Sequence, residues 1–150
     1  MKELEVFVND PFDASKLKDL FVNREDLQLA SPNSVWPFSE TEWSETFAKN
    51  SENCSLLFYI EGTLIGHTSF LPRDEDLYLC YVILHPNFRR QGYSEQMVKL
   101  SEEFARLNYP HEEIHLNVSK GNDRAYRLYE KAGYQEYKKE ETKVKMKKTL

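Results

Sequence analysis

One run of apolar residues, 77–84, constrains the fold more than any other part of the chain. A strand with one wet face alternates between apolar and polar residues, whereas a nearly uninterrupted apolar run is typical of a strand that is covered on both faces. We therefore expect a central sheet with helices on both sides. The chain has 150 residues, which suits a single domain over residues 1–150, because such a core is usually complete within about 100–200 residues.

Short apolar and alternating segments predict the other strands. Strict alternation is typical of a half-buried strand, and β-branched runs between turn residues are typical of buried ones. The dipeptide Glu61-Gly62 is a hairpin signal between two of these segments. The predicted strands are residues 4–9, 56–60, 63–71, 77–84 and 114–118, with further strand structure in the tail around Val144 and Met146.

Helical spacing of apolar residues predicts about four helices. Ser39 and Glu42 form a capping box, which predicts a helix that carries Trp43 and Phe47 on one face. The other predicted helices are residues 13–22, 93–108 and 122–132. The element order is then β-α-α-β-β-β-α-β-α-β-β, a mixed α/β (α+β) fold with a central sheet flanked by about four helices.

Composition excludes several classes of protein. Apolar residues make up 40% of the chain and charged residues 30%, a globular balance. No apolar run approaches the ~20 residues that cross a bilayer, and the first six residues carry acids where a signal peptide would be apolar. We therefore expect a cytoplasmic protein with no membrane partner. Cys54 and Cys80 are too few for a disulfide scaffold or a zinc site, so we expect two small core residues and no metal.

Charge is divided unevenly along the chain. Residues 1–75 hold 6 Lys and Arg against 14 Asp and Glu, whereas residues 76–150 hold 14 against 11. A general nucleic-acid binder is usually more basic than this. The lysines of the tail alternate with Val144 and Met146, which favours a strand with one wet face over a nucleic-acid site. The basic half is where we expect an anionic ligand.

The segment from Val82 to Ser94 carries the clearest chemistry. A buried strand runs into a loop with Arg89, Arg90 and Gly92, and a predicted helix begins at once. The first amides of a helix have no internal partners, and the helix dipole adds positive charge there. The segment therefore predicts a pocket for a phosphate or diphosphate, which Gly92 lets the backbone approach closely. The alternative is a plain strand-to-helix turn with solvated arginines.

Two motifs in this half resemble one known family. The run Arg89-Arg90-Gln91-Gly92-Tyr93-Ser94 resembles the Arg/Gln-x-x-Gly-x-Gly/Ala signature of the GNAT superfamily of N-acetyltransferases. The run from Asn122 to Tyr134 resembles that family's Asn-x-x-Ala-x-x-x-Tyr-x-x-x-Gly-Phe segment, with Tyr134 in place of Phe. The resemblance is specific from about Thr63 to Tyr134. It implies a GNAT-like mixed sheet and an acetyl-CoA-dependent transferase that acetylates a primary amine.

The resemblance also implies which residues hold acetyl-CoA. In the family, the central strand splays from its neighbour and its backbone pairs with the pantetheine arm, which implies this role for Val82, Ile83 and Leu84. The loop and helix start hold the diphosphate. The residues implied there are Arg89 together with the amides of Arg90, Gln91, Gly92, Tyr93 and Ser94. Ser94 departs from the usual Gly or Ala, but it keeps a small side chain and the amide.

Three polar residues of the second motif are further candidates. Asn122 matches a family position at the pantetheine arm or thioester. Tyr129 matches the tyrosine that lies near the sulfur and acts as general acid, and a phenol with a pKa of about 10 is protonated at neutral pH. The alternative for Tyr129 is a packed aromatic residue. Arg124 has two equal readings, a phosphate ligand or a solvated side chain.

The sequence leaves the identity of the general base open. Asn117 stands where some relatives place a Glu, and an amide cannot act as a base. The candidates are His115, two residues earlier, and Glu75 or Asp76 acting through water. An acceptor that arrives neutral needs no base.

The resemblance implies that the N-terminal half binds the acceptor, because in the family the first helices and nearby loops line the acceptor groove. Its aromatic and acidic residues suggest a wall that favours a cationic amine; the residues concerned are Trp36, Pro37, Phe38, Glu40, Glu42, Trp43 and Glu45. The alternative is an amphipathic helix with Trp43 and Phe47 in the core and its acids in water. A non-catalytic acyl-CoA-binding module is the alternative function, and either a monomer or a homodimer fits the sequence.

Overall fold

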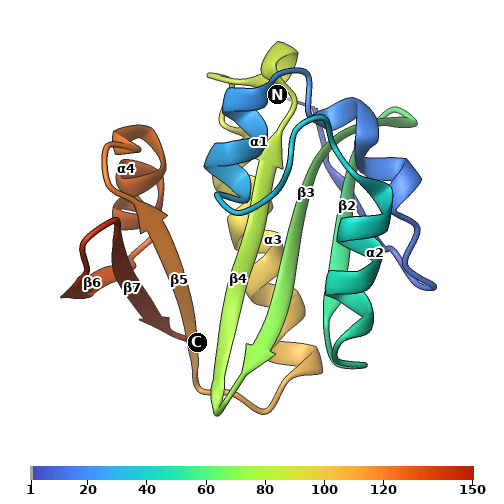
Figure 1. Ribbon diagram of the computed structural model, residues 1–150. Helices are drawn as coiled ribbons and strands as arrows, with labels where there is room; N and C mark the ends of the chain where they lie inside the picture. The colour runs from blue at the N-terminus through green and yellow to red at the C-terminus, as the bar shows by residue number, and fades with distance from the viewer. Residues whose placement is uncertain (1) are drawn as a thin grey trace.

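The computed structural model describes residues 2–150, and its centre is one seven-stranded sheet (Figure 1). The strands are β1 (Glu5–Val8), β2 (Cys54–Ile60), β3 (Thr63–Arg73), β4 (Asp76–Leu84), β5 (Glu113–Ser119), β6 (Gln135–Lys139) and β7 (Lys143–Thr149). Their order across the sheet is β1-β2-β3-β4-β5-β7-β6. All neighbours are antiparallel except β4 and β5, which are parallel. The predicted mixed α/β fold is therefore confirmed.

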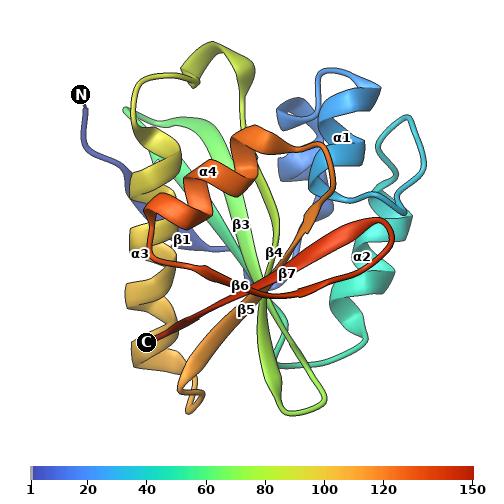
Figure 2. The ribbon, with the colours of Figure 1, turned by 90° about the vertical axis from the view of Figure 1, so that its left-hand side faces the viewer.

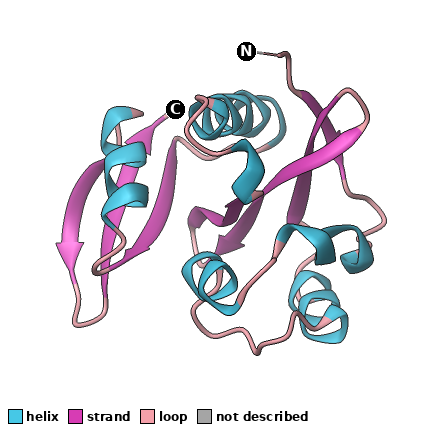
Figure 3. Cartoon of the chain, turned by 90° about the horizontal axis from the view of Figure 1, so that it is seen from above, coloured by secondary structure: helices cyan, strands magenta, loops and turns pink. Residues whose placement is uncertain are grey.

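Helices cover both faces of the sheet (Figures 2 and 3). The helical segments are the 3-10 helices η1 (Ala14–Leu20) and η2 (Pro86–Phe88) and the α-helices α1 (Arg24–Ala30), α2 (Glu40–Ala48), α3 (Tyr93–Asn108) and α4 (Asp123–Lys131). α3 and α4 pack on one face, and η1, α1 and α2 pack on the other. Leu56 packs in the core beneath α3 and α4, and its neighbour Leu57 packs in the core beneath η1, α1 and α2. Two covered faces are the physical reason for the unbroken apolar strands.

The N-terminal helices depart from the prediction in one place. The helix predicted over residues 13–22 is the shorter 3-10 helix η1 (Ala14–Leu20), and the unpredicted helix α1 follows it. Leu27 is the one buried apolar residue of α1. A helix of seven residues with a single buried apolar side chain has no apolar repeat from which it could be predicted. The capping box of α2 is confirmed, because the Glu42 amide donates to Ser39 Oγ over 3.1 Å. Across residues 2–150, none of the helices has both the length and the apolar character of a membrane span.

β4 and β5 separate soon after they begin. Their pairing is confined to Leu77 with Ile114 and Tyr78 with His115, and Figure 1 shows the two strands diverging beyond that point. The opposite edge of β4 stays paired with β3 as far as Leu84. From residue 79 onward, the edge of β4 that faces β5 therefore has no strand partner.

A bulge marks the place where β4 changes course. The register between β3 and β4 shifts between His67 and Ser69, and Tyr81 has a positive φ of 53°. His67 is fully buried, and its Nδ1–H donates to the Tyr81 carbonyl over 2.8 Å, because a carbonyl can only accept. Its Nε2 then accepts from the Ser55 hydroxyl, also over 2.8 Å. Burial lowers the pKa of His67 to about 4, so a neutral imidazole supports the bulge.

Candidate active site

A cleft of about 720 Å³ opens where β4 and β5 separate. It is bordered by residues 79–84 of β4, residues 117–119 of β5, the start of α3, the helix α4 and the loop that follows α1. Seven basic side chains and two acidic ones line it. This excess of positive charge suits an anionic ligand, as the basic half of the sequence predicts.

The start of α3 presents free backbone amides to the cleft. Gly92 is the N-cap residue with φ 87°, and no side chain caps the helix. The first amide bonded within the helix is that of Gln96, which donates to the Gly92 carbonyl, so the amides between them have no intrahelical partner. Gly92, Ser94 and Arg90 line the cleft, whereas Gln91 and Tyr93 do not. The Tyr93 side chain is buried, and only its backbone belongs to this loop.

Arg89 has a different role from the other arginines of the cleft. Its Nε donates to the Leu84 carbonyl over 3.0 Å, and its guanidinium forms an ion pair with Asp26 at 3.1 Å. Asp26 belongs to α1 and is largely buried. Arg89 therefore joins the loop to β4 and α1 through internal contacts, although it also borders the cleft.

Four arginines of the cleft have no carboxylate within 4 Å anywhere in residues 2–150; they are Arg73, Arg90, Arg124 and Arg127. The two lysines differ from them, because Lys131 pairs with Glu95 at 2.9 Å and Lys143 with Glu140 at 3.7 Å. Arg124 is exposed and borders the cleft, so both predictions for it, a phosphate ligand and a solvated side chain, stay open. Arg73 and Arg127 are cleft residues that the sequence motifs did not single out.

Tyr129 lies in the cleft wall and is 7% exposed. Burial raises its pKa well above the usual range, with a further increase from the neighbouring Cys80 thiol. The phenol is therefore protonated at neutral pH. Asn122 also lines the cleft and caps α4, because its Oδ1 accepts from the Ala125 amide over 3.3 Å. The second motif thus brings its two principal residues to the same cleft as the first.

Comparison with known proteins agrees with this geometry. The family model for the acetyltransferase (GNAT) family matches residues 22–134. The chain belongs to the GNAT acetyltransferase family. Members of this family use acetyl-CoA, and the family assignment confirms the resemblance that the two motifs carry. No curated protein matches the chain significantly.

Solved structures share the GNAT fold at low sequence identity. The GNAT domain of PAT from S. lividans has a TM-score of 0.83 and 15% identity, over 98% of this chain and 90% of that one. Spermidine N-acetyltransferase from Vibrio cholerae, in complex with CoA and spermine, has a TM-score of 0.80 and 17% identity, over 97% and 95%. A GNAT acetyltransferase from Elizabethkingia anophelis with acetyl-CoA bound has a TM-score of 0.72 and 14% identity, over 98% of both chains.

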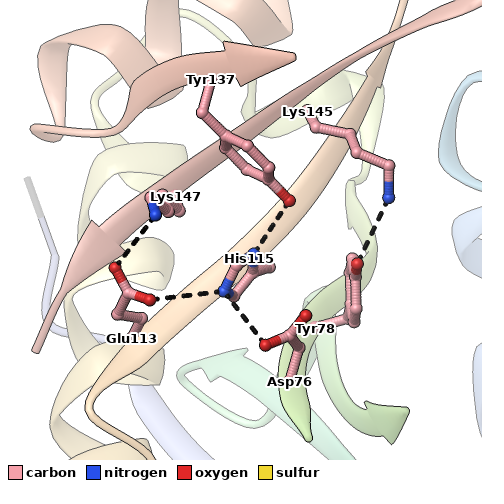
Figure 4. Close-up of polar contacts among 7 residues, drawn as sticks. All are labelled: Asp76, Tyr78, Glu113, His115, Tyr137, Lys145 and Lys147. Carbon is pink, nitrogen blue, oxygen red and sulfur yellow. Dashed lines mark hydrogen bonds and ion pairs between the residues drawn. The ribbon is translucent and has the colours of Figure 1, made fainter. Parts of the chain in front are cut away.

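The predicted base candidates of this GNAT protein lie outside the cleft. Figure 4 shows His115 within a cluster of ionisable side chains, beside the joined ends of β4 and β5. Its Nδ1 is 3.0 Å from the Tyr137 hydroxyl, and its Nε2 is 3.5 Å from Asp76 and 3.7 Å from Glu113. His115, Asp76 and the exposed Glu75 do not line the cleft, whereas Asn117 does. The geometry therefore gives none of the three a direct path to the cleft.

None of the residues of the predicted acidic and aromatic wall lines the cleft, although the Trp43 ring lies 4.8 Å from that of Tyr81, which does. Trp43 and Phe38 instead pack on Phe21 with ring centroids 5.3 Å apart. Glu40 and Glu45 point to solvent. Trp43 and Phe47 lie in the core, as the alternative of an amphipathic helix predicts. The binding of a cationic amine by the remaining residues of this wall stays a prediction.

Proposed function

We propose that the protein transfers the acetyl group of acetyl-CoA to a primary amine. The observation that carries this proposal is that three features share one cleft: the uncapped start of α3, the unpaired edge of β4 and the buried phenol of Tyr129. The first suits a diphosphate, the second a linear arm with amide groups, and the third a departing thiolate.

The diphosphate end is formed by backbone groups and supported by side chains. The amides of residues 90–94 would donate to the phosphate oxygens, with the helix dipole adding to the attraction. Arg90, Arg124 and Arg127 supply unpaired positive charge at this end. Arg89 acts as a positioning residue, since its bonds to Leu84 and Asp26 hold the loop against β4 and α1.

The edge of β4 would guide the arm of the donor into the cleft. Val82, Ile83 and Leu84 belong to the segment whose edge toward β5 has no strand partner. Free N–H and C=O groups on such an edge bind an amide-containing chain as a further strand. Asn122 borders the same passage from the opposite wall.

Acetyl-CoA supplies an activated thioester, and Tyr129 would supply the proton that its sulfur needs on departure. The raised pKa of Tyr129 keeps this proton in place at the pH of the reaction. Both carboxylates that line the cleft are ion-paired, Asp26 with Arg89 and Glu95 with Lys131. We therefore propose that the amine enters in its neutral form and that no side chain acts as general base.

Two measurements on the same samples test this proposal. Calorimetry with coenzyme A should detect binding, and thiol release from acetyl-CoA with mixed amines should show turnover. Tyr129→Phe should lower the rate about 100- to 1,000-fold and leave CoA affinity unchanged, because the phenol acts only as the thiolate departs. The control Tyr137→Phe changes a phenol outside the cleft and should keep full activity.

Each failure of this test has a distinct meaning. Absence of CoA binding would overturn the proposal altogether. Binding without thiol release for any amine would favour the non-catalytic acyl-CoA-binding module. Equal rates for Tyr129→Phe and the wild-type protein would remove Tyr129 from the chemistry.

A further inference from the structure

The cleft has a second cationic end, away from the diphosphate loop. Arg73, the last residue of β3, lines the cleft and pairs in register with Asp76 at the beginning of β4. The diphosphate loop follows Leu84, the residue that ends β4. Nearly the whole length of β4 therefore separates the backbone of Arg73 from the start of α3. The guanidinium of Arg73 has no ion pair within residues 2–150.

The Arg73 side chain lies near Tyr81, and both residues line the cleft. Burial raises the pKa of the Tyr81 phenol, as do the nearby Cys80 and Glu42 side chains, and the charge of Arg73 acts against that increase. Tyr81 is itself held in place, because its carbonyl accepts from His67 and its ring lies 4.8 Å from that of Trp43. A neutral phenol does not neutralise the guanidinium. Arg73 thus presents to the cleft a positive charge that is not ion-paired with a carboxylate of residues 2–150.

This charge lies near the proposed reacting centre. The Cys80 thiol lies close enough to Arg73 for the guanidinium to lower its pKa, although burial raises that pKa overall to about 11. The same thiol lies close enough to Tyr129 to raise the pKa of the phenol. Arg73, Cys80 and Tyr129 all line the cleft, and Cys80 lies near both of the other residues. A small molecule bound in this cleft can therefore have one end at Tyr129 and the other at Arg73.

We propose that Arg73 binds a carboxylate of the acceptor, so that the substrate is a small amine that also carries a carboxylate, such as an α-amino acid. This inference rests on the proposed N-acetyltransferase function. A planar guanidinium binds a carboxylate through two parallel hydrogen bonds. A polycationic amine, in contrast, would meet unpaired arginines and no unpaired carboxylate in this cleft.

The reaction balances with this acceptor. The neutral amine nitrogen attacks the thioester carbonyl carbon, a C–N bond forms and the C–S bond breaks. The thiolate takes the proton of Tyr129, the new amide nitrogen releases one proton to water, and the phenolate regains a proton from water. The carboxylate takes no part in the chemistry, and its contact with Arg73 holds the amine at the thioester.

The test compares amines that differ only by the carboxylate. The pairs are glycine with methylamine, β-alanine with ethylamine, and phenylalanine with phenethylamine. At a pH where both members of a pair have an appreciable neutral fraction, kcat/KM per neutral amine should be about 10- to 100-fold higher for the acid. Arg73→Gln should remove this preference by lowering kcat/KM for the acids alone, and Arg73→Lys should keep part of it. Arg106→Gln changes an exposed arginine of α3 outside the cleft and should behave as wild type.

The outcomes separate this inference from the proposed function. Acetylation of plain amines as fast as of their acid partners would overturn the role of Arg73 and leave the transferase intact. An equal loss of kcat/KM for plain amines and amino acids in Arg73→Gln would also overturn the role of Arg73. CoA binding with no acetylation of any amino acid would overturn it as well. Absence of CoA binding and of all turnover would instead be the failure of the proposed function.

Discussion

The two ends of the cleft are built in different ways. The diphosphate end comes largely from one continuous stretch, residues 82–94, in which strand, loop and helix follow one another. The Arg73 end is assembled from separate segments: β3 supplies Arg73 and His67, β4 supplies Tyr81, and Trp43 of α2 packs on Tyr81. A continuous stretch can be identified by a motif, whereas a site assembled from distant segments needs the fold. This difference is why the sequence identified the donor and left the acceptor open.

Among the effects that distinguish the two ends, the largest should be the loss of stability of the Arg73 end in acid. The pKa of buried His67 is about 4 when folded and about 6.5 when unfolded, so protonation favours the unfolded chain. The stability due to the neutral ring is complete above about pH 6.5 and falls as the pH drops toward 4, by about 3 kcal/mol. Denaturant unfolding of wild type and His67→Gln across this range measures it.

The variant His67→Gln should lack this part of the acid destabilisation, because its side chain cannot titrate. His111→Gln, which changes a histidine away from the bulge, should follow the wild-type curve. Parallel pH curves for His67→Gln and wild type would contradict the assignment of a neutral buried imidazole.

An intermediate effect is expected at the diphosphate end. Gly92 has φ 87° and borders the cleft, so Gly92→Ala both strains the loop and adds a methyl group where the ligand approaches. We expect CoA affinity to fall about 10- to 30-fold by calorimetry. An alanine in the left-handed conformation costs about 1–2 kcal/mol, so the free loop should relax away from it and CoA binding would have to restore it. Gly62→Ala is the matched control. Gly62 has a similar φ of 81°, and a methyl group there would meet no atom within 4 Å.

Gly62→Ala should therefore lose stability by a comparable amount and keep its CoA affinity. If both variants bound CoA equally well, the loop before α3 would not be the diphosphate site, and the distinction between the two ends would lose its basis.

The smallest effect should come from Arg127, one of the two cleft arginines that the motifs did not single out. Arg127→Gln on α4 should weaken CoA binding about 3- to 10-fold, because one partly exposed charge contributes about 1 kcal/mol. The loss should shrink as salt is added. The KM of the acceptor should remain unchanged, in contrast to Arg73→Gln. A change in acceptor KM for Arg127→Gln would show that the two ends are not independent.

Much of the fold follows from local patterns. Residues 93–108 form the predicted helix because its apolar stripe spans four turns, and residues 77–84 form the predicted strand because both of its faces are covered. α1 escaped prediction because seven residues with one buried apolar side chain show no period. The family assignment followed from two motifs that are each continuous in the sequence.

The parts of the site that escaped prediction depend on contacts across the fold. Arg89 looked like a phosphate ligand, and its pairing with Asp26 depends on how α1 packs against the loop. Glu42 and Trp43 looked like a binding wall, yet α2 turns its aromatic face into the core. Arg73 stood in a charged turn, and only the pairing of β3 with β4 brings it beside Tyr81. Each depends on partners more than 5 residues away along the chain, which a pattern in one window cannot show.

Two residue pairs join β4 to β5, and beyond them the facing edges of the two strands are not hydrogen-bonded to each other. A molecule that inserts its own amides there becomes a structural member of the fold as well as a reactant. Donor binding should therefore raise the free energy of unfolding by about 2.7 kcal/mol at a concentration of 100 times Kd, and the melting temperature should rise with it. Cellular levels of the donor would then set how long this protein persists, as well as how fast it works.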